Sequence, residues 1–227
     1  MRLSMLSDAY DLFWQYRDIY IAGLKNALIA AAIGLCLSLV VGVISGVIRF
    51  ASKGVAGRAV AVYVSIVRNT PMMVQIYFIY FGLPALGVTL SAFMTGILAL
   101  TFNSGAYIAE IVRGGLAAIP KGQSEAAMAL GLNRRVLLMR VLLPQAAPTV
   151  LPAITGQFVQ LIKDTSLLYT IAVLEITKAA DDVGNETYQF LEAYLVSCVV
   201  YILVCATLNL LVDQYERRAG FSKFRRA

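Results

Sequence analysis

Histidine is absent from this chain, and charged residues are scarce. The 227 residues contain no His, and Asp, Glu, Lys and Arg together make up 14%, whereas a soluble domain carries about 25% charged residues. Without histidine the chain lacks the commonest transition-metal ligand and the commonest general base. We therefore expect no metal site and no catalytic residue in this chain.

Cysteines and nucleotide-binding motifs are also sparse. The three cysteines, Cys36, Cys198 and Cys205, lie in apolar stretches. Cys198 and Cys205 are spaced so that they share a helix face and cannot bridge each other, which favours a packing role. No G-x-x-x-x-G-K-[ST] phosphate-binding loop occurs. If transport here uses ATP, the nucleotide and its Mg²⁺ are expected on another polypeptide, and no cofactor is expected on this one.

Long apolar runs dominate the sequence. Hydrophobic residues make up 59%, and the stretch from Ala27 to Ile48 carries no charge. A helix needs about 20 apolar residues to cross a bilayer. The pattern predicts an all-α polytopic membrane protein, a single domain over 1–227. Five transmembrane helices are predicted, at about 24–48, 59–81, 90–112, 149–173 and 190–212.

Two of these spans carry irregular sequence. Arg68, Asn69, Thr70 and Pro71 interrupt the second span, and proline predicts a kink or a break there. An equally defensible interpretation makes 59–68 an interfacial helix and places the span at 72–90. Prolines 144, 148 and 152 predict an irregular entry to the fourth span. At the N-terminus, Arg2 followed by polar and acidic residues predicts an amphipathic lead-in rather than a secretory signal.

The 19 lysines and arginines are unevenly distributed over the connections. Most lie in the links 49–58 and 113–140 and in the tail after 212, and few lie in the other connections. Because basic residues collect on the cytoplasmic side, the N-terminus is predicted outside and the C-terminus in the cytoplasm. This topology, with attraction to anionic membrane lipid, explains the net charge of +6, so no nucleic-acid partner is expected.

The cytoplasmic loop 113–148 holds a short helix with a defined end. Residues 123–130 are good helix formers, and Gly131 follows near the C-cap position. Ala126 and Ala127 allow another surface to approach the backbone closely, and Glu125 and the Arg134–Arg135 pair supply charge. Taken alone, the pattern equally suits an interfacial helix without a partner.

Four stretches together resemble the polar amino-acid permease family of ABC importers. Glu125-Ala126-Ala127-x3-Gly131-x11-Leu143-Pro144 is similar to the EAA loop of these permeases. The others are Arg68–Pro71 with Gln75 and Phe81–Pro84, Asn103–Glu110 running to Gly115, and Lys163–Leu167. They occur in the family order over roughly residues 20–215. Asn69 departs from the glycine usual after this arginine, which leaves the local turn geometry open.

The resemblance implies a type I ABC-importer permease in the bacterial inner membrane. Its implied partners are two cytoplasmic ABC ATPase subunits, a second permease chain of the same or a homologous kind, an extracytoplasmic substrate-binding protein and an amino-acid substrate. It also implies that the loop helix docks on the ATPase. The coupling residues would be Gly122, Glu125, Ala126, Ala127, Gly131, Arg134 and Arg135.

Polar residues inside the spans are candidates for the substrate pathway, because charges there are costly to bury. Asn103 and Glu110 share one helix face, and Gln157, Gln160 and Asp164 share another, so two opposed faces could form a polar pocket near the midplane. The full candidate set is Arg68, Thr70, Gln75, Asn103, Tyr107, Glu110, Gln157, Gln160 and Asp164.

Each charged candidate also has a purely structural interpretation. Glu110 could pair with Arg113, Asp164 could pair with Lys163 or a neighbouring chain, and Arg68 could reach the inner headgroups. For the whole chain, the alternative function is a self-sufficient secondary carrier or channel subunit. That alternative leaves the EAA-like loop unexplained, and a membrane-embedded enzyme lacks any nucleophile–base pair.

Overall fold

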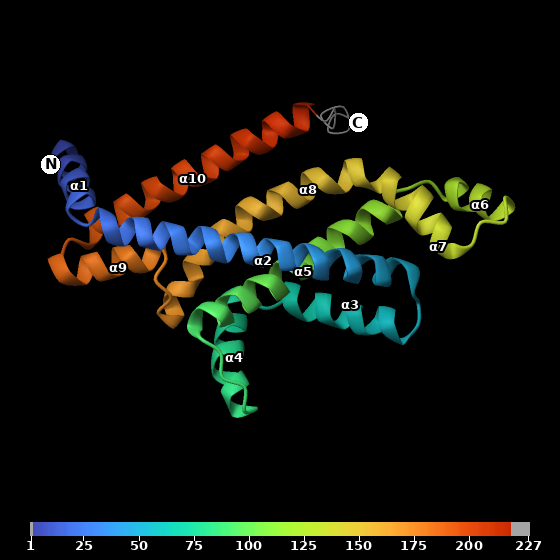
Figure 1. Ribbon diagram of the computed structural model, residues 1–227, viewed down its shortest axis with the longest axis horizontal. Helices are drawn as coiled ribbons and strands as arrows, with labels where there is room; N and C mark the ends of the chain where they lie inside the picture. Colours follow the sequence, from blue (N-terminus) through green and yellow to red (C-terminus); the bar gives the residue numbers. More distant parts are fainter. Residues whose placement is uncertain (1, 219–227) are drawn as a thin grey trace. The chain divides into compact units, whose positions relative to one another are not determined.

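The computed structural model describes residues 2–218, and within this range the chain forms helices and no strand. The predicted all-α fold is therefore confirmed. Lys223, Arg225 and Arg226 of the predicted cytoplasmic tail lie outside the described residues. Figure 1 shows the helices in chain order. Their bounds are α1 (Arg2–Gln15), α2 (Arg17–Ala51), α3 (Val55–Arg68), α4 (Met72–Ala85), α5 (Ala92–Ala117), α6 (Lys121–Ala129), α7 (Arg134–Val136), η1 (Leu137–Leu142), α8 (Leu143–Asp164), η2 (Thr165–Ile171), α9 (Ile176–Thr187) and α10 (Phe190–Arg218).

The chain divides into two compact units. The first contains the residues up to Cys36 together with 71–101 and 159–210. The second contains 37–70, 102–158 and the chain from Leu211 onward. The long helices α2, α5, α8 and α10 each contribute residues to both units.

Four helical segments of the described chain are long and apolar enough to cross a membrane. They are Arg17–Ala51, Ala92–Ala117, Arg134–Ile171 and Phe190–Gln214. They match the first, third, fourth and fifth predicted spans, and each is longer than predicted. Together they indicate a multi-pass membrane protein.

The second span, predicted over 59–81 with an interruption at 68–71, is formed as two separate helices. Helix α3 ends at Arg68 and α4 begins at Met72, with Pro71 in an extended conformation between them. Proline has no backbone N–H to continue the ladder, and it disfavours helical geometry in the residue before it. The break expected at this proline is therefore confirmed. Helix α4 has 14 residues and so spans about 21 Å, less than the ~30 Å hydrocarbon core.

Side chains at the break satisfy the last carbonyls of α3. The Asn69 amide donates to the Ser65 carbonyl at 2.7 Å, and the Thr70 hydroxyl donates to the Ile66 carbonyl at 2.9 Å. These bonds add side-chain donors to the Ser65 and Ile66 carbonyls, which also accept from the Asn69 backbone N–H at 3.2 and 3.3 Å. The C-terminus of α3 is thus capped by side-chain hydrogen bonds.

The fourth membrane helix begins earlier than its predicted start at 149. Helical backbone runs from Arg134 to Ile171, through the π-helical segment η1 and then α8. Pro144 cannot donate to the carbonyl of Arg140 and crowds it, which accounts for the wide turn over 137–142. Pro148 and Pro152 lie inside α8 without ending it. The predicted irregular start of the fourth membrane helix is confirmed. The predicted start at residue 149 was wrong, because the helix begins at Arg134.

The first unit has two apolar cores. One joins α2, α4, α5, α8 and η2, and its fully buried members include Ile76, Leu100 and Leu168. The other joins α1, α9 and α10 around Tyr20, whose hydroxyl donates to the Ala193 carbonyl at 3.0 Å. Helix α9 was not predicted, yet its apolar face is part of this core.

The second unit is held together by close contact between α2 and α5. Gly42 and Gly46 form a G-x-x-x-G pair on α2, and a Cβ at either position would lie under 3 Å from atoms of α5. Such small residues let two membrane helices approach closely without a hydrophobic driving force. The largest core here gathers Ile108, Val112 and Leu116 of α5 with residues of η1 and α8. This tight contact positions the charged ends of α2 and α5 beside each other.

Candidate functional site

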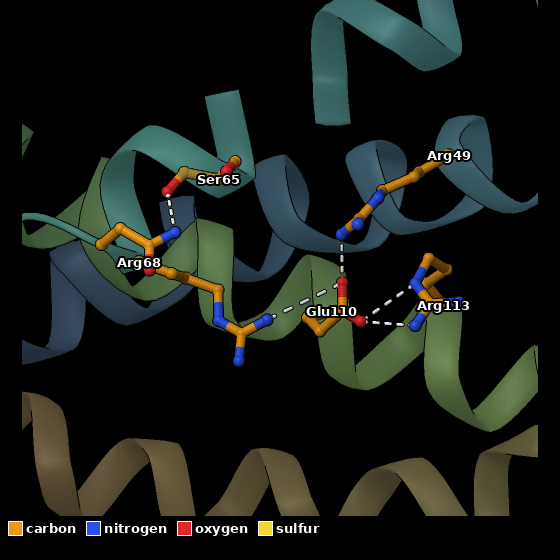
Figure 2. A network of polar contacts seen from close by, with 6 residues as sticks. Arg49, Ser65, Arg68, Glu110 and Arg113 are labelled. Atoms are coloured by element: carbon orange, nitrogen blue, oxygen red, sulfur yellow. Dashed lines mark hydrogen bonds and ion pairs between the residues drawn. The ribbon is translucent and has the colours of Figure 1, made fainter. Parts of the chain in front are cut away.

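Glu110 is the centre of an arginine cluster in the second unit. Its carboxylate accepts hydrogen bonds from Arg49 at the end of α2 and from Arg113 one turn further along α5, at 3.0 Å from Arg113 Nε. Arg68, the last residue of α3, lies 3.9 Å away through its terminal nitrogen. Figure 2 shows the three guanidinium groups directed at this one carboxylate.

The cluster is unequal in charge and partly shielded from solvent. The Glu110 side chain is 23% exposed, and one negative charge faces three positive ones. The Arg68 guanidinium also lies over the ring of Tyr107, 5.5 Å from its centre, a cation–π geometry. The pairing of Glu110 with Arg113 that the sequence allowed is confirmed. A role for Glu110 toward substrate stays a prediction. Its carboxylate is already engaged by three cations, which argues against that role.

Some of the other predicted pathway residues lie outside the arginine cluster around Glu110. Asn103 is buried on α5, 6% exposed. Thr70 is exposed and caps α3, whereas Gln75 is half-buried on α4 in the first unit. Of the predicted pathway residues, the structure thus brings Arg68, Tyr107 and Glu110 together.

Gln160 and Asp164 form a second polar pair, at the end of α8. The Gln160 amide donates to the Asp164 carboxylate at 2.8 Å. Among the ion pairs found in the described chain, none joins Asp164 to Lys163. Gln157, half-buried one turn earlier, belongs to the second unit. The polar pocket predicted from these faces remains a prediction.

The predicted loop helix is present as α6. It ends in a Schellman motif: Leu132 N–H donates to the Ala127 carbonyl at 3.1 Å and Gly131 N–H to the Met128 carbonyl at 2.9 Å. Gly131 has φ of 74°, the left-handed conformation that glycine adopts at little cost. Asn133 then caps α7, accepting from Val136 N–H at 2.9 Å. The turn geometry predicted for Gly131 is confirmed.

The surface of this loop is apolar as well as charged. Met128 is 59% exposed and Leu130 is 79% exposed, and Glu125 and Ala126 lie exposed beside them. Ala127 is buried against its own unit. Gly122, Arg134 and Arg135 are exposed too. Exposed large apolar side chains on a short polar loop are typical of an interaction surface.

Glu175 is a buried carboxylate that the sequence did not reveal. It is fully buried and caps α9, accepting from the backbone N–H groups of Thr177 and Lys178 at 2.8 Å each. The Tyr201 hydroxyl donates to it at 2.8 Å. Burial raises the pKa of Glu175 above its ordinary value, although these hydrogen bonds act in the opposite direction. Glutamate is not a preferred N-cap residue, so the sequence carried no clear signal.

Comparison with known proteins places the chain in a family. The family described as "Binding-protein-dependent transport system inner membrane component" matches residues 21–220. The glutamine transport system permease protein GlnP of Escherichia coli strain K12 is 34% identical over 211 residues, covering 92% of this chain and 96% of that protein. The L-cystine transport system permease protein TcyB of Bacillus subtilis strain 168 is 39% identical over 159 residues, covering 70% and 68%.

A solved structure shares the fold at similar coverage. A chain of an amino acid ABC transporter crystallised with histidines matches with a TM-score of 0.84 and 30% identity, over 91% of this chain and 96% of that one. The chain therefore belongs to the family of binding-protein-dependent transport system inner membrane components, which confirms the resemblance to ABC-importer permeases that its motifs indicated.

Proposed function

We propose that this chain is the membrane-spanning permease subunit of an ATP-driven importer for a polar amino acid, in the bacterial inner membrane. The observation that carries the proposal is the α6–Gly131–α7 element. It combines a rigid Schellman turn with exposed Met128 and Leu130. The family assignment and relatives named for glutamine and cystine transport support the substrate class.

In this proposal α6 couples the permease to a separate ATPase. Met128 and Leu130 enter an apolar groove of the ATPase, while Glu125, Arg134 and Arg135 orient the contact. The Schellman turn fixes the C-terminal end of α6, so displacement of the helix is passed on to the following residues without fraying at that end. ATP and Mg²⁺ are bound by the partner, and this chain supplies no catalytic group.

The remaining partners follow from the same role. Two ATPase subunits act on a pair of permease chains, and an extracytoplasmic binding protein delivers the amino acid. Substrate crosses beside the predicted pathway residues, which offer donors for its carboxylate and acceptors for its ammonium group. Asp164, oriented by Gln160, is the acceptor candidate that no arginine occupies in the described chain.

Co-purification tests this function. The chain, tagged and expressed in its native host, is expected to bring down an ABC ATPase at equal stoichiometry. A double variant of the exposed apolar pair, Met128→Ser with Leu130→Ser, is expected to lose the ATPase while still reaching the membrane. The control, Met139→Ser in η1, removes an apolar side chain about as exposed as Met128 and is expected to keep the ATPase. A chain that carries no ATPase and still transports would be a secondary carrier or channel.

A further inference from the structure

Four basic side chains line an open hollow in the second unit. They are Arg49 near the end of α2, Lys53 in the link, Arg58 in the first turn of α3 and Arg113 of α5. The hollow measures about 430 Å³, and no acidic residue lines it. Glu110 offsets only part of the charge, because it is shared among three arginines. Lys53 and Arg58 have no ion-pair partner in the described chain.

Backbone groups at the start of α3 add to this positive field. The cap residue Gly54 has no side chain to occupy the first amide groups of the helix, and a helix N-terminus attracts anions. Gly57, in the same turn, fits so closely against the link that a Cβ would lie 1.9 Å from the Ser52 carbonyl oxygen. The sequence therefore fixes the helix start beside Lys53 and Arg58.

The hollow adjoins apolar surface rather than bulk polar surface. The membrane helix Arg17–Ala51 ends two positions before Lys53. On α3, Val55 is 83% exposed, Val62 58% and Ile66 59%. Arg58 lies three residues after Val55 and four before Val62, so it shares their helix face. A ligand here meets cations at one end and an apolar stripe at the other.

We propose that this hollow binds the phosphodiester headgroup of an anionic phospholipid, whose acyl chains lie along the apolar face of α3. A zwitterionic phosphatidylcholine brings its own cation into the same field and is disfavoured. A free phosphate ion uses the basic groups but gains nothing from the apolar stripe. Basic pockets between membrane helices on the cytoplasmic side, where this link is predicted, suit such headgroups.

The test counts phospholipids bound to the purified full-length complex by native mass spectrometry, titrating phosphatidylglycerol and phosphatidylcholine separately. Each basic residue near an anionic headgroup is worth about a fivefold change, so Lys53→Gln with Arg58→Gln is expected to weaken phosphatidylglycerol binding about thirtyfold. Lys53→Arg with Arg58→Lys keeps the charge and is expected to restore binding. Both residues are exposed, and an unchanged size-exclusion profile confirms folding.

The matched control is Lys121→Gln with Arg140→Gln, which removes the same charge from exposed positions of the same unit outside the hollow. Phosphatidylglycerol binding is expected to be unchanged in this control. An equal loss in both double variants would show non-specific attraction and overturn the proposal. Displacement of the lipid by an equal concentration of inorganic phosphate would overturn it in favour of a free-anion site. Lipid bound to the purified permease chain alone but missing from the complex with its ATPase subunits would assign the hollow to a protein partner and also overturn it.

Discussion

Arg49 at the end of α2 donates a hydrogen bond to Glu110 of α5, and this contact joins the charged ends of two helices that glycine packing brings together. Arg113 holds the other carboxylate oxygen of Glu110, so both oxygens are already engaged by guanidinium groups. The geometry favours a structural role for the Glu110 carboxylate over a transport role.

Replacing Glu110 is therefore expected to lower stability. Glu110→Gln leaves three guanidinium groups without their shared carboxylate. The expected loss is about 1–3 kcal/mol, less than for a fully buried pair because the side chain is partly exposed. Thermal unfolding of the purified complex measures it, and Asp213→Asn, an exposed carboxylate of the same unit, serves as the control. An unchanged melting temperature with lost uptake would return Glu110 to the substrate pathway.

Gly131→Val is expected to impair coupling without preventing membrane insertion. A β-branched residue in the left-handed conformation costs about 1–2 kcal/mol, enough to weaken docking of α6 by roughly five- to thirtyfold. Gly131→Asn is the matched control, since asparagine tolerates that conformation. ATP-driven uptake at equal membrane levels is the measurement. Full uptake by the valine variant would remove this turn from the coupling mechanism.

Asp164→Asn separates a substrate role from a packing role. The change keeps the shape and the contact with Gln160 but removes the charge. If Asp164 receives the substrate ammonium, substrate-stimulated ATP hydrolysis drops while the assembled complex keeps its melting temperature. A lower melting temperature with loss of assembly would show a packing role, and wild-type values of both would exclude Asp164 from either.

The buried carboxyl of Glu175 is expected to make stability depend on pH. Its pKa is raised by burial, so the native state holds the proton more tightly than the unfolded chain. The resulting stabilisation is complete below the unfolded pKa and is lost as pH rises through the native pKa. Glu175→Gln, which stays neutral, is expected to remove this decline from melting curves recorded across the acidic range. Tyr201→Phe removes a hydrogen bond to the carboxylate and is expected to extend the decline to higher pH; identical curves for all three proteins would contradict the assignment.

Local chemistry explains which features were predictable from the sequence. Pro71 ends α3 and Gly131 ends α6 through effects confined to neighbouring residues, and both were predicted. The start of the fourth membrane helix was misplaced because its prolines are accommodated by a π-helical turn, which depends on packing against α5. Arg49 as a partner of Glu110 could not be read from the chain, since the two are 61 residues apart.

The central claim is that this permease moves a polar amino acid only when a partner hydrolyses ATP. The most direct measurement is uptake of radiolabelled amino acids into proteoliposomes holding the purified complex, with the binding protein outside and ATP inside. The account predicts uptake of a polar amino acid that requires both ATP and the binding protein, and that falls in Gly131→Val. Uptake of equal size without ATP, driven by an ion gradient alone, would contradict it.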